Sequence, residues 1–234
     1  MHSIAETLSG ITLGVTNDAE IESRLEEIKR EEREQHAREQ RKALNVPAWW
    51  TVEKFDESRW PALKSWIATG NLKSNLLIVG PTNVGKSHAA CALALRAATE
   101  EKATIYRLRE HAFYPLWDQA RYHDSGLFRD VVEKAKRADV LVYDDLGKVE
   151  ITKGTEYALT PFGCVLFDIF DERAERRRVN YVTTRYPAFD LLKKAVGEDF
   201  IRRVLQREGE DASRGRIIAY RAVCLRAEKH AEAE

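Results

Sequence analysis

The sequence predicts an α/β protein: a five-stranded parallel sheet with helices on both faces, preceded by a charged helical arm. Three observations predict it. Short apolar runs alternate with helical stretches along most of the chain, which favours a parallel sheet covered on both sides. A glycine-rich loop stands between the first apolar run and an Ala/Leu-rich helical stretch. Before both lies a long charged stretch that contains neither Gly nor Pro.

Length and composition allow one main core with a small appendage. The chain has 234 residues, 44% of them hydrophobic, and its 38 basic and 38 acidic residues cancel. A zero net charge does not attract nucleic acid, so any DNA contact requires a local patch. No apolar run approaches the length that spans a bilayer and the N-terminus shows no signal pattern, so we expect a cytoplasmic protein without membrane contact. Cys91, Cys164 and Cys224 are widely spaced, so we expect buried thiols rather than a disulfide or zinc site.

The arm, residues 1–45, is predicted to be helical from Asp18 to Lys42, behind Asn17 as its cap. Ile21, Leu25 and Ile28 fall on one face, after which the stripe stops. This pattern fits either a solvated, partly disordered helix or a helix whose short stripe docks on a partner. A proline at position 47 ends the helical pattern.

The connector, residues 46–72, is rich in aromatic residues. Such density favours core packing over a base-stacking surface. The aromatic residues are Trp49, Trp50, Phe55, Trp60 and Trp66.

The phosphate-binding pattern G-x-x-x-x-G-K-[ST] occurs in full after the apolar run 76–79. Two glycines let successive backbone N–H groups point at phosphate oxygens, and the following helix adds its positive pole. Lys86 is expected to neutralise the β and γ phosphates of ATP, and the Ser87 hydroxyl to ligate Mg²⁺. The predicted nucleotide-binding residues are Gly80, Pro81, Thr82, Asn83, Val84, Gly85, Lys86, Ser87 and His88.

The remaining elements complete a domain of residues 73–226, followed by a polar tail, 227–234. Further strands are predicted at 103–107, 139–145, 179–184 and 216–220, and helices at 88–96, 110–123, 157–178 and 193–206.

Polar residues at the ends of two predicted strands suggest ATP chemistry. Asp144 and Asp145 follow four apolar residues, at the strand end where ligands gather in open α/β sheets. Asp144 is expected to hold Mg²⁺ and Asp145 to polarise the attacking water. Thr183 and Thr184 end the next strand, where a hydroxyl can reach the γ-phosphate, although threonine also simply favours strands.

Together with the phosphate loop, an ordered set of motifs resembles the DnaC/IstB-like branch of AAA+ ATPases. The resemblance covers roughly 55–226. It rests on Gly80–Ser87, Tyr143-Asp144-Asp145-Leu146-Gly147, Val182-Thr183-Thr184, Gly197–Arg203 and Ala212-Ser213-Arg214. It implies a five-stranded parallel P-loop sheet in proteins that load the replicative DNA helicase or assist transposases, and that assemble side by side with ATP at the subunit boundary.

The resemblance also implies roles for single residues. Lys86 and Ser87 bind phosphate and Mg²⁺, Asp144 supports the metal, and Asp145 is the hydrolytic carboxylate. Thr184 matches the first sensor, Arg203 the arginine finger, with Arg202 as its competitor, and Arg214 the arginine that senses nucleotide from the C-terminal side.

The leading hypothesis is an ATP-hydrolysing helicase loader that assembles as a ring or spiral on single-stranded DNA, with its arm on the helicase. Alternatives are an IstB-like transposition helper acting on duplex DNA and a non-hydrolysing assembly locked by ATP. A small-molecule kinase ranks last. Candidate DNA contacts, each with a structural alternative, are Phe113, Tyr114, Trp117, Arg121, Tyr122, His123, Lys148, Lys153, Arg173, Arg176, Arg177 and Arg178.

Overall fold

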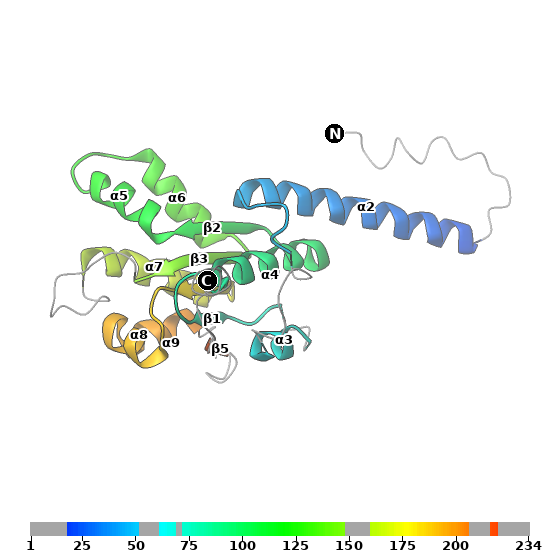
Figure 1. The fold of residues 1–234 in the computed structure, drawn as a ribbon. Coiled ribbons are helices and arrows are strands. Elements are labelled where there is room, and N and C mark those ends of the chain that lie inside the picture. The colour runs from blue at the N-terminus through cyan, green and yellow to red at the C-terminus, as the bar shows by residue number, and fades with distance from the viewer. Residues whose placement is uncertain (1–17, 52–60, 69–71, 148–159, 206–215, 220–234) are drawn as a thin grey trace, which may run out of the picture.

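The computed structural model describes residues 18–51, 61–68, 72–147, 160–205 and 216–219. Its strands are β1 (Leu76–Val79), β2 (Ile105–Arg109), β3 (Val140–Leu146), β4 (Val179–Thr184) and β5 (Arg216–Ala219). Its helices are α2 (Asp18–Leu44), α3 (Pro61–Ala68), α4 (Lys86–Glu101), α5 (Glu110–Ala120), α6 (Gly126–Arg137), α7 (Pro161–Glu175), α8 (Phe189–Val196) and α9 (Glu198–Leu205) (Figure 1).

The strands form one parallel five-stranded sheet in the order β2-β3-β4-β1-β5, which confirms the predicted fold class. β1 lies between β4 and β5, and β3 between β2 and β4. The loop after β1 and the acidic end of β3 therefore meet at the same edge of the sheet, one strand apart, on either side of the end of β4.

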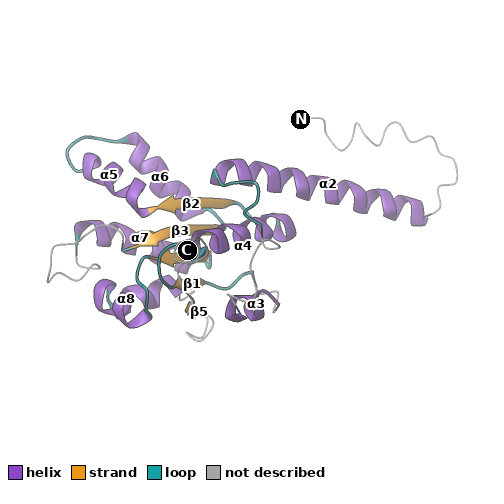
Figure 2. Ribbon diagram, in the orientation of Figure 1, coloured by secondary structure: helices purple, strands orange, loops and turns teal. Residues whose placement is uncertain are grey.

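Helices cover both faces of the sheet (Figure 2). Alternate residues of the strands enter two separate cores, as the two-residue period of a strand requires. In β3, Val140 and Val142 join the core beneath α4, whereas Leu141 and Tyr143 join the core formed with α5 to α9. A continuous apolar run in the sequence thus reflects burial on both sides.

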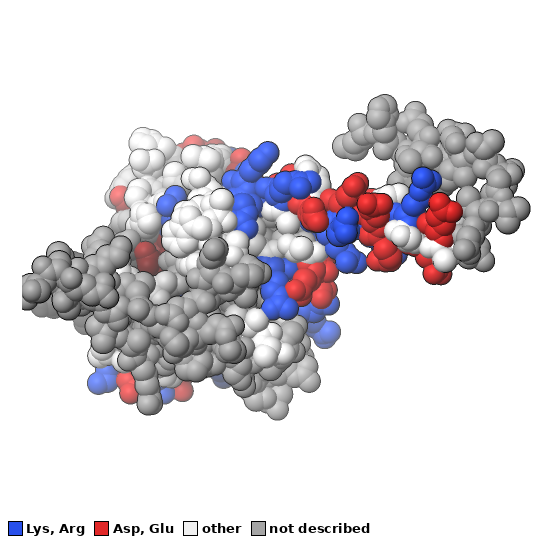
Figure 3. Space-filling view, turned by 45° about the vertical axis from the view of Figure 1, so that its right-hand side comes forward, with Lys and Arg blue, Asp and Glu red and all other residues white. Residues whose placement is uncertain are grey.

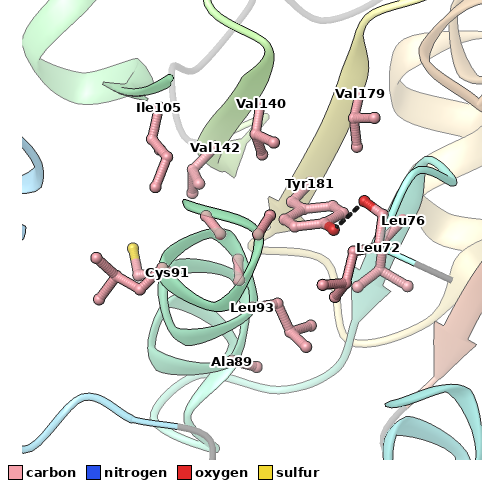
Figure 4. Close-up of a cluster of buried hydrophobic side chains, with 14 of the residues drawn as sticks. Leu72, Leu76, Ala89, Cys91, Leu93, Ile105, Val140, Val142, Val179 and Tyr181 are labelled. Carbon is pink, nitrogen blue, oxygen red and sulfur yellow. Dashed lines mark hydrogen bonds between the residues drawn. The ribbon is translucent and has the colours of Figure 1, made fainter. Parts of the chain in front are cut away.

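The core beneath α4 is closed by residues from outside the sheet. Tyr181 of β4 is fully buried, and its hydroxyl donates a 2.7 Å hydrogen bond to the Leu72 carbonyl (Figure 4). Trp66 of α3 packs edge-on against the Tyr181 ring, with centroids 6.0 Å apart. Trp66, an aromatic residue of the connector, is therefore a core residue.

The arm is one helix whose two halves differ in their surroundings. Its C-terminal half lies beside α4 and the edge strand β2, where the Gln40 Oε1 accepts a 2.8 Å hydrogen bond from the Ile105 N–H. His36 Nε2 lies 3.0 Å from the Ala103 carbonyl, and Leu44 is only 3% exposed. The N-terminal half extends away from the domain (Figure 1). The predicted boundary after residue 45 thus separates segments that pack together in space.

The extended half of α2 is polar around most of its circumference. Acidic and basic side chains alternate along it (Figure 3), and Lys29 pairs with Glu26 at 2.7 Å. Ile21, Leu25 and Ile28 stay 43%, 49% and 46% exposed. The predicted apolar stripe is therefore present on a helix face without contacts to the described part of the domain.

Several local predictions differ from the structure. A single helix over 193–206 is wrong, because Gly197 takes a φ of 88° and separates α8 from α9. Helices α3 and α6 were not predicted. The expectation of buried thiols holds for Cys91 but not for Cys164, which is exposed, and Cys224 lies outside the described residues.

Arg173 is a buried residue and not part of a solvated helix end. It is fully buried and donates to the carbonyls of Ala135, Ala138 and Val179 and to the Asn180 Oδ1, at 2.5 to 2.7 Å. One guanidinium thereby joins α7, the end of α6 and β4.

Among the described helices, none has the length and apolar character needed to cross a bilayer.

Candidate nucleotide-binding site

The phosphate loop joins the buried strand β1 to the N-terminus of α4. Asn83 and Gly85 take positive φ values of 64° and 91°. A Cβ on Gly85 would meet no atom within 4 Å, so this position favours glycine because of its backbone conformation and not for lack of space. Val84 is 2% exposed and anchors the loop, while Thr82 and Asn83 are exposed at its tip.

Lys86 is folded back onto the loop. Its Nζ donates to the Gly80 carbonyl at 2.9 Å and to the Pro81 carbonyl at 2.5 Å, and the residue is 7% exposed. A buried ammonium requires acceptors, and the loop carbonyls supply them. The amine that the sequence assigns to the phosphates is thus already held at the loop.

A carboxylate and two hydroxyls connect the ends of β3 and β4 to the first turn of α4. The Ser87 Oγ donates to Asp144 Oδ1 at 2.6 Å, and the Thr183 Oγ1 donates to the same oxygen at 2.7 Å. These residues come from the first turn of α4, from β3 and from β4. The structure therefore brings the predicted metal residues Ser87 and Asp144 together.

Arg107 completes this cluster, and the sequence analysis did not identify it. Its Nη2 lies 2.5 Å from Asp144 Oδ2, with side-chain exposures of 12% and 3% for the two residues. Burial alone raises the pKa of Asp144, but the hydrogen bond and charge of Arg107, with the Ser87 and Thr183 donors, outweigh it and lower the pKa below its usual value. The available signal was a cationic residue within a strand, but its pairing spans 37 positions of the chain.

Asp145 is placed by an irregular end of β3. It has a φ of 71°, and the register between β3 and β4 shifts between Tyr143 and Leu146. Its backbone N–H donates to the Thr183 Oγ1 at 2.9 Å, and the residue is partly exposed. The bulge turns this carboxylate away from the strand repeat, as bulges beside active sites commonly do. Its hydrolytic role remains a prediction.

The two threonines of β4 have different partners. Thr183 contacts Asp144 and Asp145, as described above. Thr184 is fully buried, and its hydroxyl donates to the Leu146 carbonyl at 2.9 Å and accepts from the Tyr186 N–H at 3.2 Å. The sensor role of Thr184 remains a prediction, and Thr183 is the hydroxyl that the structure places on the acidic pair.

Position 147, two residues after Asp145, requires glycine. Gly147 has a φ of 80°, and a Cβ there would lie 2.4 Å from the Tyr186 ring. Its N–H donates at 2.8 Å to Glu110 Oε2, which also accepts from the Tyr143 hydroxyl at 3.1 Å. Glu110 is fully buried, so the end of β3 is fixed by a carboxylate inside the core.

The predicted arginines lie away from this cluster in the single chain. Arg203 of α9 pairs with Asp171 of α7 at 2.8 Å, and its guanidinium lies 5.7 Å from the Phe167 ring. Arg202 pairs with Asp199 at 3.1 Å and is exposed. Arg214 lies outside the described residues. The roles of all three remain predictions.

The connector reaches the site through the indoles of Trp49 and Trp50, which both contact His88. The Trp50 ring stacks on His88, with centroids 5.5 Å and planes 23° apart, and His88 Nε2 lies 3.1 Å from the Thr51 carbonyl. Burial lowers the pKa of His88 and outweighs the contact with the Thr51 carbonyl, which raises the pKa. The Arg107 guanidinium carbon lies 5.4 Å from the centroid of the Trp50 ring. The described start of the connector thus contacts a predicted nucleotide-binding residue and the partner of Asp144.

The candidate DNA-binding segment after β2 is partly core. Phe113 and Trp117 are 0% and 7% exposed, whereas Tyr122 is 70% exposed. Arg121 lies over the Trp117 and Tyr122 rings, at 5.1 and 5.5 Å. Arg121 and Tyr122 therefore keep an exposed ring and a cation together. Lys148 and Lys153 lie outside the described residues.

The residues present fit ATP and Mg²⁺. Hydroxyl and carboxylate oxygens are the ligands that Mg²⁺ prefers, and Ser87 and Asp144 place two of them 2.6 Å apart at the start of a helix. Phosphate oxygens would meet positively charged or partially positive groups here. These are the N–H groups of the phosphate loop, the N-terminus of the 16-residue α4 and the Lys86 ammonium.

Comparison with known proteins gives a family. Residues 1–191 match the family described as IstB-like ATP binding protein. An insertion sequence ATP-binding protein, from IS1162 of Pseudomonas fluorescens, is 31% identical over 117 residues, 50% of this chain and 46% of the relative. The insertion sequence ATP-binding protein y4uH of Sinorhizobium fredii is 28% identical over 140 residues, 60% and 52% of the two chains. The chain thus spans about half the length of these relatives.

Solved structures share the fold at low identity. A structure of DnaI has a TM-score of 0.57 at 14% identity and covers 79% of this chain and 98% of its own. AMPPCP-bound DnaA from Aquifex aeolicus has a TM-score of 0.57 at 16% identity, with 81% and 55% covered. This chain therefore shares the fold of these two structures.

Proposed function

Because this chain belongs to the IstB-like ATP-binding family, we propose that it hydrolyses ATP to assist a transposase on duplex DNA. Both sequence relatives described above are insertion sequence ATP-binding proteins by name. This evidence reverses the order of the two leading hypotheses that the sequence alone suggested.

One observation carries the ATPase part of the proposal: the cluster of Ser87 and Thr183 on Asp144, with Asp145 beside it. The cluster joins the phosphate loop to the ends of β3 and β4 through hydrogen bonds of 2.6 to 2.9 Å. A site that only needs to bind phosphate requires the loop, but not a second carboxylate on a bulge.

The residues divide the chemistry between them. Lys86 would exchange its loop carbonyls for phosphate oxygens, and Ser87 and Asp144 would hold Mg²⁺, which neutralises phosphate charge when bound. Asp145 orients a water and accepts its proton as the water attacks the γ-phosphorus. The bond between the γ-phosphorus and the β–γ bridging oxygen breaks in the same reaction, and ADP leaves with the electron pair. Thr183 fixes both carboxylates relative to each other through its hydroxyl and the Asp145 N–H.

We expect assembly between copies to bring a further cation to the site. Arg203 is 37% exposed at its side chain and bound to Asp171, so it does not serve the site of its own chain in this structure. We expect it to reach the γ-phosphate of a neighbouring copy, where an arginine stabilises the charge of the transferring group.

Helicase loading is the second candidate, because the arm offers a surface for another protein. The exposed stripe of Ile21, Leu25 and Ile28 on a helix that extends from the domain fits capture of another protein. A transposase and a helicase are both possible occupants of this stripe, so the arm does not distinguish the two functions.

The nucleic acid does distinguish them. Binding to duplex and single-stranded DNA of equal length should be measured by fluorescence anisotropy, with ATP, without nucleotide, and with Lys86→Ala as the control. The proposal expects ATP-dependent binding that favours the duplex at least tenfold and is lost in Lys86→Ala. ATP-dependent preference for the single strand would replace it with helicase loading.

A further inference from the structure

The Trp50 indole occupies the junction between the arm and the candidate metal site. It lies six positions beyond Leu44, the last residue of α2. His88 stacks on it at 5.5 Å, and the Arg107 guanidinium carbon lies 5.4 Å from its centroid. A guanidinium within about 6 Å of an indole is attracted by the ring, and most strongly where water is excluded.

Arg107 needs this support, because its own polar contacts are few. Its Nη2 binds Asp144 Oδ2, and its Nε is buried without a hydrogen-bond acceptor among the described residues. The orientation of the guanidinium plane therefore depends on one carboxylate oxygen and one aromatic ring.

Asp144 in turn depends on Arg107 for the placement of one oxygen. Its Oδ1 accepts from Ser87 and Thr183, while its Oδ2 accepts from Arg107. Groups that bind the ligands of a metal fix their orientation, and removing one such group lowers metal affinity by about 10- to 100-fold.

We propose that Trp50 is a positioning residue for the Mg²⁺ site, which holds Arg107 against Asp144 and so couples the segment behind the arm to metal binding. The inference rests on the proposed ATP site and adds a connection to its surroundings. By reciprocity, a partner that displaces this segment changes the affinity for Mg²⁺, and Mg²⁺ changes the affinity for that partner.

The chain offers a matched control for this residue. Trp49 precedes Trp50, is 60% exposed and contacts the same His88 ring at 5.3 Å. Among the described residues, Arg107 lies over the ring of Trp50 and not over that of Trp49. Trp49 also packs edge-on against the Trp50 ring, with centroids 6.0 Å apart. A change at Trp49 therefore disturbs His88 and one neighbour of Trp50, but it leaves the indole beneath Arg107 in place.

The test measures the Mg²⁺ concentration that half-saturates binding of a fluorescent ATP analogue, in the full chain, for the wild type, Trp50→Leu, Trp50→Phe and Trp49→Leu. Trp50→Leu should raise it about three- to tenfold, since Trp50 acts one contact beyond the groups that bind the metal ligand. Trp50→Phe should restore most of the loss, and Trp49→Leu should match the wild type. Analogue binding in EDTA should be the same in all four proteins.

Arg107→Lys provides a second route that leaves Trp50 intact. Lysine keeps the charge beside Asp144 but loses the planar group that lies over the indole. It should raise the half-saturating Mg²⁺ concentration as Trp50→Leu does, and the double variant should be no worse than the more severe single one. An unchanged Trp50→Leu, equal effects at Trp49 and Trp50, or effects that multiply in the double variant would each overturn the inference. Failure of the wild type to bind the analogue would instead reject the proposed ATP site.

Discussion

At the scale of single residues, the site depends on backbone positions that few side chains tolerate. Asp145 and Gly147 both have positive φ values, of 71° and 80°. Positive φ strains an aspartate more than a glycine, and such strain persists only where neighbouring contacts enforce it. Thr183 and Glu110 supply those contacts through the N–H groups of Asp145 and Gly147.

Gly147→Ala tests how tightly this turn is fixed. The added Cβ would lie 2.4 Å from the Tyr186 ring at a φ of 80°. We expect a loss of about 1–3 kcal/mol in the free energy of unfolding, measured by urea denaturation, and a lower rate of ATP hydrolysis. Gly126→Ala is the matched control, because a Cβ there meets nothing within 4 Å. Equal stabilities of the two variants would contradict this account.

Arg173 is the largest fully buried side chain of the described residues, and its removal should be costly. Arg173→Met leaves the Ala135, Ala138 and Val179 carbonyls without their donor. We expect a loss of at least about 1–3 kcal/mol in the free energy of unfolding by chemical denaturation, the usual cost of a buried acceptor left unpaired. Arg176→Met, at an exposed position of the same segment, should cost under about 0.5 kcal/mol. A mild effect of Arg173→Met would show that the core repacks around the gap.

At the scale of elements, the arm should separate into two functions. Serine at all three stripe positions, Ile21, Leu25 and Ile28, should leave the melting temperature within about 2 °C of the wild type, because exposed substitutions rarely affect stability. Capture of the partner protein, measured by pull-down, should be lost. Leu44→Ala, at a buried position of the same helix, should instead cost about 2–4 kcal/mol. A large loss of stability in the triple variant would show that the stripe packs on the domain.

The elements that sequence reasoning predicted are those with local signals. The loop over Gly80–Ser87 and the strands that end in Asp145 and Thr184 carry a motif or an unbroken apolar run. Helix α6 was missed, although Ser125 caps it by accepting from the Phe128 N–H and its Val131, Val132 and Ala135 are spaced for one face. The break at Gly197 was also missed, because a glycine within a helical pattern does not reveal its φ.

The contacts that sequence reasoning could not supply are long-range. Arg107 meets Asp144 across 37 positions, and Trp50 meets Arg107 from outside the predicted ATPase domain. Both contacts depend on how segments that are distant in the sequence are arranged in the folded protein, including the order of the strands in the sheet. The sequence also could not show which of the two adjacent threonines contacts Asp144. The alternation of side chains along β4, opposite the irregular end of β3, determines that Thr183 and not Thr184 faces Asp144.

At the scale of the whole molecule, ATP is expected to act by joining copies of the chain on DNA. The phosphate loop, the acidic pair and Thr183 form one half of a site at the carboxyl edge of the sheet. Arg203 lies on α9, bound to Asp171 of its own chain at 2.8 Å. The central claim is that hydrolysis needs the loop of one copy and the arginine of the next.

Mixing two inactive variants tests this claim most directly. Lys86→Ala lacks the loop amine, and Arg203→Ala lacks the arginine, so neither should hydrolyse ATP alone in the presence of duplex DNA. In an equal mixture, about a quarter of the boundaries should pair an intact loop with an intact arginine, and ATP hydrolysis should return to about that fraction of the wild-type rate. Release of phosphate is the measurement. A mixture as inactive as its components, or full activity of Arg203→Ala alone, would contradict the shared site.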